Sequence, residues 1–385
     1  MLNRLKKIDL IMLLCLFGFM AVSALLVRSA TNVEGGYSGK DMQQIVFYGA
    51  GFVLIVLATL FDYRLLLKTW YVWYGIGLAL LVAVYFLAPP INGARSWFEI
   101  PGTSGMLFQP AEIVKIFLIL AVAWLMGRRQ GDPLSMRKDV LLVAAVSFVP
   151  FVLVMIQPDL GNATIYVFIV LGMLWIGNVR YTYVLIGLAA VVGGLVLFAS
   201  LFNTYNEEIK TYLVDHHKTH WYERINTYIH PEQASDDARR QTEYAKIAIG
   251  SGGLAGDGYM QGESKNRKFI PYTYSDSIFV VVGEEFGFQG AAILLLLYFI
   301  FIYRMIIIAY QCIDIRGSFI IIGIASMLVF QIFQNIGMMI GLMPLTGITL
   351  PFVSYGGTSL LLNMISIGLV FSIRAHQEKY TLDDT

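Results

Sequence analysis

Long apolar segments recur along this chain of 385 residues, and they restrict its fold more than any other feature. A helix needs roughly 20 apolar residues to cross the hydrocarbon core of a bilayer. The charged share is only 14%, whereas soluble domains usually have about 25%. The sequence therefore predicts a polytopic membrane protein. Its apolar segments are 9–27, 43–61, 70–88, 111–126, 139–156, 163–177, 180–202, 287–309, 317–342 and 356–374.

These segments do not alternate between apolar and polar residues, as the strands of a membrane β-barrel would. We therefore predict an all-α fold with about ten transmembrane helices, forming a single domain over residues 1–385. One long loop, 203–286, separates the seventh and eighth segments. The first segment is longer than the apolar part of a typical signal peptide, so we interpret it as an uncleaved span. The net charge of +1 provides no basic surface for nucleic acid.

Lys and Arg residues indicate the orientation, because short cytoplasmic loops carry an excess of them. With the N-terminus inside, the inner segments hold far more of these residues than the short outer loops, which hold Arg28, Lys40 and Arg95. We therefore expect both termini in the cytoplasm and the long loop outside. The inner residues are Arg4, Lys6, Lys7, Arg64, Lys68, Arg128, Arg129, Arg137, Lys138, Arg180, Arg304, Arg316, Arg374 and Lys379.

Asp276 lies where the long outer loop re-enters the membrane. A carboxyl group at such a low-dielectric boundary tends to have a raised pKa, which suits a general base. Ser275, Asp276 and Ser277 are also residue types that cap helices, so a helix N-cap is an equally good interpretation. The position alone does not separate the two.

Two acidic residues, Glu284 and Glu285, follow within an apolar stretch. Carboxylates inside a membrane are costly and usually functional. The flanking Gly283 and Gly287 instead indicate a break in the helix. Upstream, segment 247–258 is rich in glycine, so its backbone can bring N–H groups close to a phosphate. The alternative is a flexible hinge, and no Gly-Lys-Ser/Thr follows to make a P-loop.

Glu112 and Lys115 are three residues apart on a predicted helix, so they share a face and can pair. They form either a structural ion pair or a pocket for an anionic head group. Asp159, in the outer turn 157–161, is either a turn former or a residue that lines a cavity. Segment 341–359 has two prolines and four glycines at membrane depth. It predicts broken backbone, which membranes tolerate only where it is buried in protein or lines a cavity.

Together these segments resemble the SEDS family (shape, elongation, division and sporulation), which includes RodA and FtsW. The resemblance extends over nearly the whole chain, and its motifs occur in the expected order. Residues 347–352 favour the RodA-like, elongation-type branch. The motifs are 108–112 with Lys115, 157–161, 247–252, 283–287 and 350–357.

The resemblance implies a peptidoglycan glycosyltransferase that polymerises lipid II outside the cytoplasmic membrane, in support of cell elongation and shape. It implies a class B penicillin-binding protein as partner and Asp276 as the catalytic residue. Arg95, Lys115, Lys246 or a divalent cation such as Mg²⁺ or Mn²⁺ would neutralise the leaving diphosphate. The expected substrate-binding residues are Arg95, Trp97, Glu112, Lys115, Asp159, Lys246 and Ser275.

The chain departs from the family pattern at several positions. The family usually has a Glu and a His shortly before the catalytic Asp, and here neither is present. Where the family has an Arg-Trp pair, this chain has Ser96-Trp97, and its arginine, Arg95, lies one residue earlier. The residues at the other departures are Tyr244, Asp257, Tyr272, Tyr274, Ser275 and Ser277.

A single displacement by a sugar 4-hydroxyl inverts the anomeric centre and needs one base, with undecaprenyl diphosphate as the leaving group. Two other functions fit the same residues. Intramembrane charges often mark transport paths, so a lipid II flippase or other precursor transporter is one alternative. A non-catalytic scaffold for the penicillin-binding protein is the other.

Overall fold

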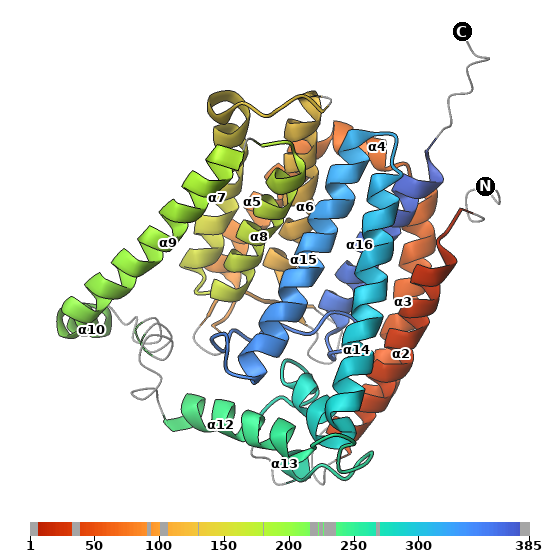
Figure 1. Cartoon of the computed structure of the whole chain (residues 1–385), viewed down its shortest axis with the longest axis vertical. Helices are drawn as coiled ribbons and strands as arrows, with labels where there is room; N and C mark the ends of the chain where they lie inside the picture. The colour runs from red at the N-terminus through yellow and green to blue at the C-terminus, as the bar shows by residue number, and fades with distance from the viewer. Residues whose placement is uncertain are drawn as a thin grey trace.

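The structure is a computed structural model that describes residues 7–32, 39–90, 94–100, 107–129, 131–179, 181–215, 222, 226, 236–266 and 270–377. Within them, a long helix corresponds to each of the ten predicted segments. All of these helices except α9, which runs obliquely away from the others, stand side by side as a bundle (Figure 1). The prediction of an all-α membrane fold is confirmed. The ten helices are α2 (Leu10–Thr31), α3 (Lys40–Leu60), α5 (Trp70–Leu87), α6 (Pro110–Met126), α7 (Leu141–Ile156), α8 (Leu160–Ile176), α9 (Tyr181–Thr204), α14 (Ile278–Tyr310), α15 (Ile315–Met339) and α16 (Gly357–Ala375).

Eight candidate membrane spans satisfy both length and hydropathy over the described residues, and α8 is a shorter apolar helix. The remaining elements are short or lie in the predicted outer loop. One pair of strands is antiparallel, with Phe98 opposite Phe108. These elements are α4 (Tyr63–Lys68), β1 (Phe98–Glu99), β2 (Leu107–Phe108), the 3₁₀ turn Gly127–Arg129, the π-helical turn Met136–Val140, α10 (Asn206–Asp215), α12 (Asp236–Ser251) and α13 (Glu263–Asn266).

Three helices, α6, α15 and α16, form the centre of the bundle. Most of their residues are buried, whereas α5 and α7 bury only a small share of theirs. The outer helices therefore present apolar side chains such as Phe86 and Phe148 outward, as expected for surfaces that face lipid. The central helices carry several of the buried polar residues, among them Lys115 on α6 and Asn335 on α15.

Helix α14 is broken at Gly287, as the flanking glycines predicted. Gly287 has φ 60° and ψ −158°, which is not helical. The predicted span began at residue 287, and the structure adds a shorter half, 278–286, ahead of the break. This half leads back from the break toward Asp276 and sets where that residue lies.

The glycine-rich segment fills the break in α14. The amides of Asp257 and Gly258 donate to the carbonyl oxygens of Glu284 and Glu285, at 2.9 and 3.1 Å. The carbonyls of residues 253 and 254 accept from the amides of 288 and 289. A Cβ added to Gly256 would lie 2.2 Å from the Glu285 oxygen, so only glycine allows this approach. These amides are bound within the chain, which favours a structural joint over a phosphate loop.

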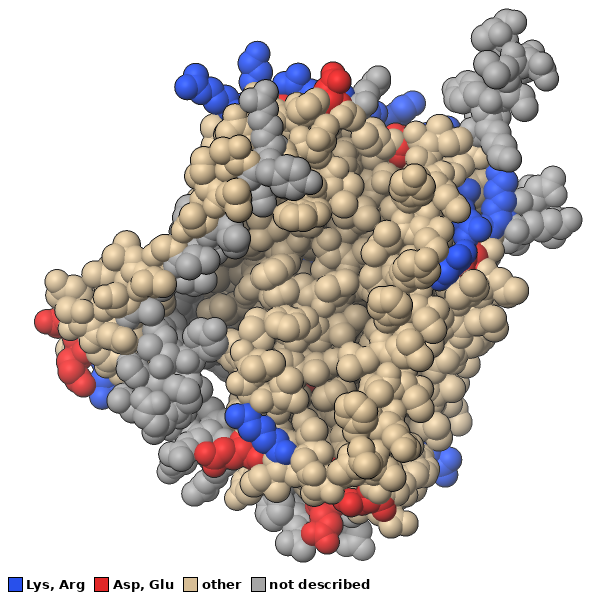
Figure 2. All heavy atoms as spheres, in the orientation of Figure 1, with Lys and Arg blue, Asp and Glu red and all other residues tan. Residues whose placement is uncertain are grey.

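Lys and Arg side chains gather mainly at the end of the bundle where the chain termini lie (Figures 1 and 2). There Asp9, which is 2% exposed, pairs with Arg304 and Arg374. Burial opposes ionisation of Asp9, yet hydrogen bonds from Arg304, the Met12 amide and Arg374 lower its pKa overall. This charge cluster joins the start of α2 to α14 and α16.

Candidate active site

Asp276 lies just before α14, against the segment that joins α15 to α16 (residues 340–356). Asn335 of α15 donates through Nδ2 to the carbonyl oxygen of Asp276 and to that of Ile348, at 2.7 Å each. The Asp276 carboxylate faces Gly347, because a Cβ added to Gly347 would lie 3.7 Å from its Oδ2. The broken backbone predicted after α15 is therefore present and lies beside Asp276.

Burial raises the pKa of Asp276 to about 6, although the amides of Asp276 and Ser277 act in the opposite direction. Its Oδ1 is buried and has no hydrogen-bond partner among the described residues. The N-cap of α14 is Ser277, and no side chain makes a capping bond there. Of the two interpretations of Asp276, the geometry favours the base, because near neutral pH this group is ionised and has a free acceptor.

A second cluster forms at the N-terminal ends of α6 and α8. Lys115, which is 1% exposed, contacts Glu112 with Nζ and Oε1 2.7 Å apart. Asp159 caps α8 by accepting from the Asn162 amide at 3.1 Å, and it also accepts from Gln109. Burial raises the pKa of Asp159, and its hydrogen bonds with Asn162 oppose that rise. The predicted ion pair is present, next to a buried carboxylate.

Segment 340–356 joins the two clusters. Gly161, two residues after Asp159, packs so closely on Ile348 that an added Cβ would be 2.8 Å from that side chain. Ile348 in turn shares the Asn335 amide with Asp276. The structure thus places Asp276 and Gly161, two residues after Asp159, against one irregular segment, although they are far apart in the sequence.

The other predicted binding residues lie around this centre. Arg95 is exposed and Trp97 is half-buried next to β1, while Ser96 between them donates to the Gln157 carbonyl at 3.1 Å. Lys246 on α12 is exposed, with Nζ close to Gly341 at the end of α15. Ser275 donates through its amide to the Tyr272 carbonyl at 2.9 Å. Among the described residues, Arg95, Trp97, Lys246 and the Ser275 side chain make no hydrogen bond to Asp276 or the ion pair.

Two residues beside Asp276 escaped the sequence analysis. Lys40 of α3 lies over the rings of Tyr274 and Tyr355, with Nζ 4.0 and 4.8 Å from their centroids. The Tyr355 amide donates to the Tyr274 carbonyl at 2.9 Å. Lys40 had been counted only as an outer-loop charge. The other is Asn335, whose signal was the run of amide side chains in an otherwise apolar helix.

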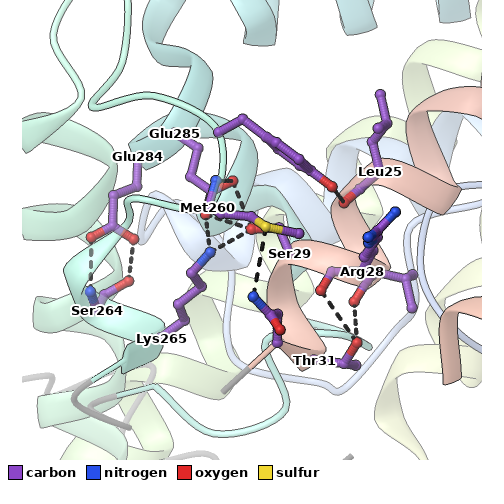
Figure 3. Close-up of polar contacts among 12 residues, drawn as sticks. Leu25, Arg28, Ser29, Thr31, Met260, Ser264, Lys265, Glu284 and Glu285 are labelled. Atoms are coloured by element: carbon purple, nitrogen blue, oxygen red, sulfur yellow. Dashed lines mark hydrogen bonds and ion pairs between the residues drawn. The ribbon is translucent and has the colours of Figure 1, made fainter. Parts of the chain in front are cut away.

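Glu284 and Glu285 are both buried and both hydrogen-bonded, as Figure 3 shows. Glu284 accepts from the amide and hydroxyl of Ser264. Glu285 accepts from Lys265, from the Ser29 hydroxyl at 2.6 Å and from the Met260 amide at 3.1 Å. These contacts fasten α13 and the loop before it to α14 and α2. The observation favours a structural role for both glutamates, rather than a transport path.

No group of three or more His, Cys, Asp or Glu side chains is arranged to hold a metal ion in the part of the chain that the structure describes.

Residues 5–379 match the family model described as "Cell cycle protein", which covers FtsW, RodA and SpoVE. Stage V sporulation protein E of Bacillus subtilis is 31% identical over 380 residues, covering 95% of this chain and 96% of that protein. The peptidoglycan glycosyltransferase MrdB of Escherichia coli K12 is 32% identical over 376 residues, covering 96% and 94%.

Two solved structures are also similar, each at 27% identity. One is a chain of a peptidoglycan synthase complex that coordinates polymerization and crosslinking, with a TM-score of 0.76 over 96% of this chain and 99% of that one. The other is the rod shape determining protein RodA of Thermus thermophilus, with a TM-score of 0.68 over 96% and 98%.

Proposed function

This chain belongs to the FtsW, RodA and SpoVE family of cell cycle proteins and is a multi-pass membrane peptidoglycan glycosyltransferase, and we propose that Asp276 is the base of its reaction. The substrate is lipid II, which the enzyme polymerises into glycan strands. The observation that carries the proposal is the Asp276 carboxylate itself. Its pKa is raised to about 6 by burial, and its Oδ1 has no hydrogen-bond partner within the described part of the chain.

In the proposed reaction, Asp276 removes the proton from the 4-hydroxyl of the acceptor sugar as that oxygen attacks the anomeric carbon of the donor. An alcohol is a poor nucleophile, so a base within hydrogen-bond distance helps. The bond to undecaprenyl diphosphate breaks in the same step, and the anomeric centre is inverted. No second carboxylate is needed as a nucleophile, and diphosphate leaves without protonation if cations neutralise it.

The Glu112–Lys115–Asp159 cluster is the proposed contact for the polar head group, because Gly161, two residues after Asp159, packs on segment 340–356 beside Asp276. Arg95, Trp97, Lys246 and Ser275 are the further binding residues. Lys115, Arg95 and Lys246 are the cations assigned to the diphosphate. A divalent cation would supply the same charge, but the described residues offer it no group of three acidic, His or Cys ligands.

We also propose that both termini are cytoplasmic and that Asp276 faces the outside, on the basis of the Lys and Arg distribution. The partner is a class B penicillin-binding protein, and the role is cell elongation and shape. The similarity to a chain of a peptidoglycan synthase complex supports such a partner.

Lipid II polymerisation by the purified chain with its partner tests the base. Asp276→Asn keeps the size of the side chain and removes its basicity, so we expect a loss of about 10²–10⁴-fold in rate. Asp257→Asn is the matched control, since Asp257 is an exposed carboxylate of the same outer region. Full polymerisation by Asp276→Asn would remove the assignment.

Substitutions of Asp276 also separate the enzyme from the transporter and the scaffold. A transporter would move the lipid II head group across proteoliposomes without polymerising it, and Asp276→Asn would leave that movement intact. A scaffold would support normal cell-wall synthesis with Asp276→Ala as long as the partner still binds. Loss of synthesis with an intact complex favours the enzyme.

A further inference from the structure

Asn335 on α15 is buried inside the bundle at 0% exposure, and its amide lies against the backbone of Asp276. We propose that Asn335 is a positioning residue of the reaction. It ties the Asp276 backbone to segment 340–356 and so holds the carboxylate in place for the attacking hydroxyl. The inference rests on the proposed role of Asp276 as the base.

The two hydrogen bonds of Asn335 use its donors completely. An amide nitrogen has two hydrogens, and here one goes to the Asp276 carbonyl and one to the Ile348 carbonyl, at 2.7 Å each. Aspartate has the same shape but no such donors, and leucine has neither donor nor acceptor. Only an amide of this length therefore joins the two backbones.

Asn335 is one of three buried amide residues near the end of α15, with Gln331 and Gln334. Gln334 donates to the Thr346 hydroxyl at 3.0 Å, so it also fastens segment 340–356. The side-chain oxygens of all three are buried without a partner among the described residues. Such oxygens cost about 1–3 kcal/mol each. Asn335 and Gln334 bear this cost while their amide nitrogens donate to Asp276, Ile348 and Thr346, which points to a role for these two residues in fastening segment 340–356.

The side chains around Asp276 do not replace this tether. Tyr272 and Tyr274 lie on its own segment, Lys40 of α3 contacts the Tyr274 ring, and Tyr355 comes from segment 340–356. From α12, Lys246 lies at Gly341. The described donors to the Asp276 carboxylate are backbone amides only. Its position is therefore set through the backbone, and freeing the backbone would let the carboxylate move toward water.

The test is lipid II polymerisation by the full chain with its partner, measured as kcat, KM and a pH profile. For Asn335→Leu we expect kcat to fall about 10- to 100-fold, as misplacement of a reacting group does, with KM little changed. The acidic limb of the pH–activity profile of Asn335→Leu should move to lower pH, because a carboxylate that reaches water ionises more easily. For Asn335→Asp we expect a similar fall in kcat but a limb moved to higher pH, since a second negative charge opposes ionisation of Asp276.

Gln331→Leu is the matched control, because it removes a buried amide from the same helix and should leave kcat and the pH profile unchanged. Asp276→Asn, measured alongside, separates the two proposals. If Asp276→Asn is inactive while Asn335→Leu and Asn335→Asp keep the wild-type kcat and profile, the positioning role is overturned and the base remains. If Asp276→Asn is active, the base itself is overturned. If Asn335→Leu does not fold, the isosteric Asn335→Asp becomes the test. An acidic limb of its pH–activity profile at the wild-type position would overturn the positioning role of Asn335.

Discussion

At the scale of single residues, the buried charged groups of this protein differ in their partners. Lys115 with Glu112 and Lys265 with Glu285 are ion pairs, in which each charge stabilises the other. Asp276 instead has a buried oxygen with no partner among the described residues. Burial without a counter-charge disfavours the ionised form. A carboxylate in that setting accepts a proton readily.

The raised pKa of Asp276 predicts how activity depends on pH. Only the ionised carboxylate accepts a proton, so polymerisation should be low below pH 6 and rise as the pH passes about 6. An initial-rate profile of the wild-type enzyme measures this. A rate that stays constant down to pH 4.5 would contradict it, with a substrate-binding curve over the same range as the control.

The same pKa predicts a pH-dependent difference in stability between the wild type and Asp276→Asn. The folded-state pKa of about 6 lies above the ordinary value for an aspartic acid side chain, so the neutral carboxyl suits the fold better than the ionised one. The contribution of Asp276 to stability is complete below about pH 4 and is lost as the pH rises through about 6. Asp276→Asn should therefore unfold at a higher temperature than wild type at pH 8. Equal thermal midpoints at pH 8 would contradict this, and the difference should vanish at pH 4.

For the buried pair, Lys115→Met leaves Glu112 without its counter-charge. We expect the free energy of unfolding to fall by about 3–5 kcal/mol, because an unpaired buried charge costs more than the pair contributes. Glu112→Gln combined with Lys115→Met should recover most of that loss in thermal stability. If both residues also contact the head group, the double variant will be stable and still polymerise poorly. A double variant as unstable as Lys115→Met would contradict the pairing argument.

At the scale of elements, the break in α14 lets one helix serve two purposes. The longer half crosses the membrane, and the shorter half leads to Asp276. The glycine-rich segment satisfies the backbone groups that the break exposes, which membrane depth otherwise makes costly. The buried Lys265, Glu285 and Ser29 contacts then fasten the shorter half to α13 and α2 (Figure 3).

The joint at the break predicts which glycines tolerate a side chain. Gly256→Ala should destabilise the protein by roughly 2–5 kcal/mol, because the new Cβ would meet the Glu285 backbone in a left-handed conformation. Gly250→Ala, within the same run, should be tolerated, since nothing lies within 4 Å of its added Cβ. Thermal midpoints of the two variants measure the contrast. Equal midpoints would show that close packing is not the reason for the glycines.

At the scale of the whole molecule, charge divides the two ends of the bundle. The end with the termini carries most of the Lys and Arg, together with the Asp9 cluster (Figure 2). The opposite end carries α12 and α13 (Figure 1). The positive-inside rule predicts that the basic end lies in the cytoplasm, which would place Asp276 at the outer surface.

Labelling of single cysteines tests this orientation. In a chain with Cys15→Ser and Cys312→Ser, we would place one cysteine by Glu99→Cys and, separately, by Lys138→Cys. Both positions are exposed, and they lie at the two predicted ends. A membrane-impermeant maleimide should label the first in intact cells and the second only after permeabilisation. The reverse pattern would invert the topology and remove the proposed extracytoplasmic site.

The amino-acid sequence by itself determined the class of fold and the extent of the helices. Bilayer thickness dictates the length of an apolar span, so ten segments predicted ten helices to within a few residues. The exception was α14, which begins at residue 278 rather than 287. The first half of α14 contains two buried glutamates, whose charge interrupts the apolar pattern in the sequence. Lys265 and Ser29, the partners of Glu285, lie elsewhere in the chain.

Only the tertiary structure favours one interpretation of each motif over the other. The capping and catalytic interpretations of Asp276 predict the same residue types, and they differ only in where the side chain lies relative to α14 and segment 340–356. The glycine-rich segment is identified as a structural joint by the hydrogen bonds that its amides donate to the carbonyls of α14. The contact of Asn335 with Asp276 joins residues 59 positions apart. Such contacts arise from packing, for which local hydropathy and spacing carry no signal.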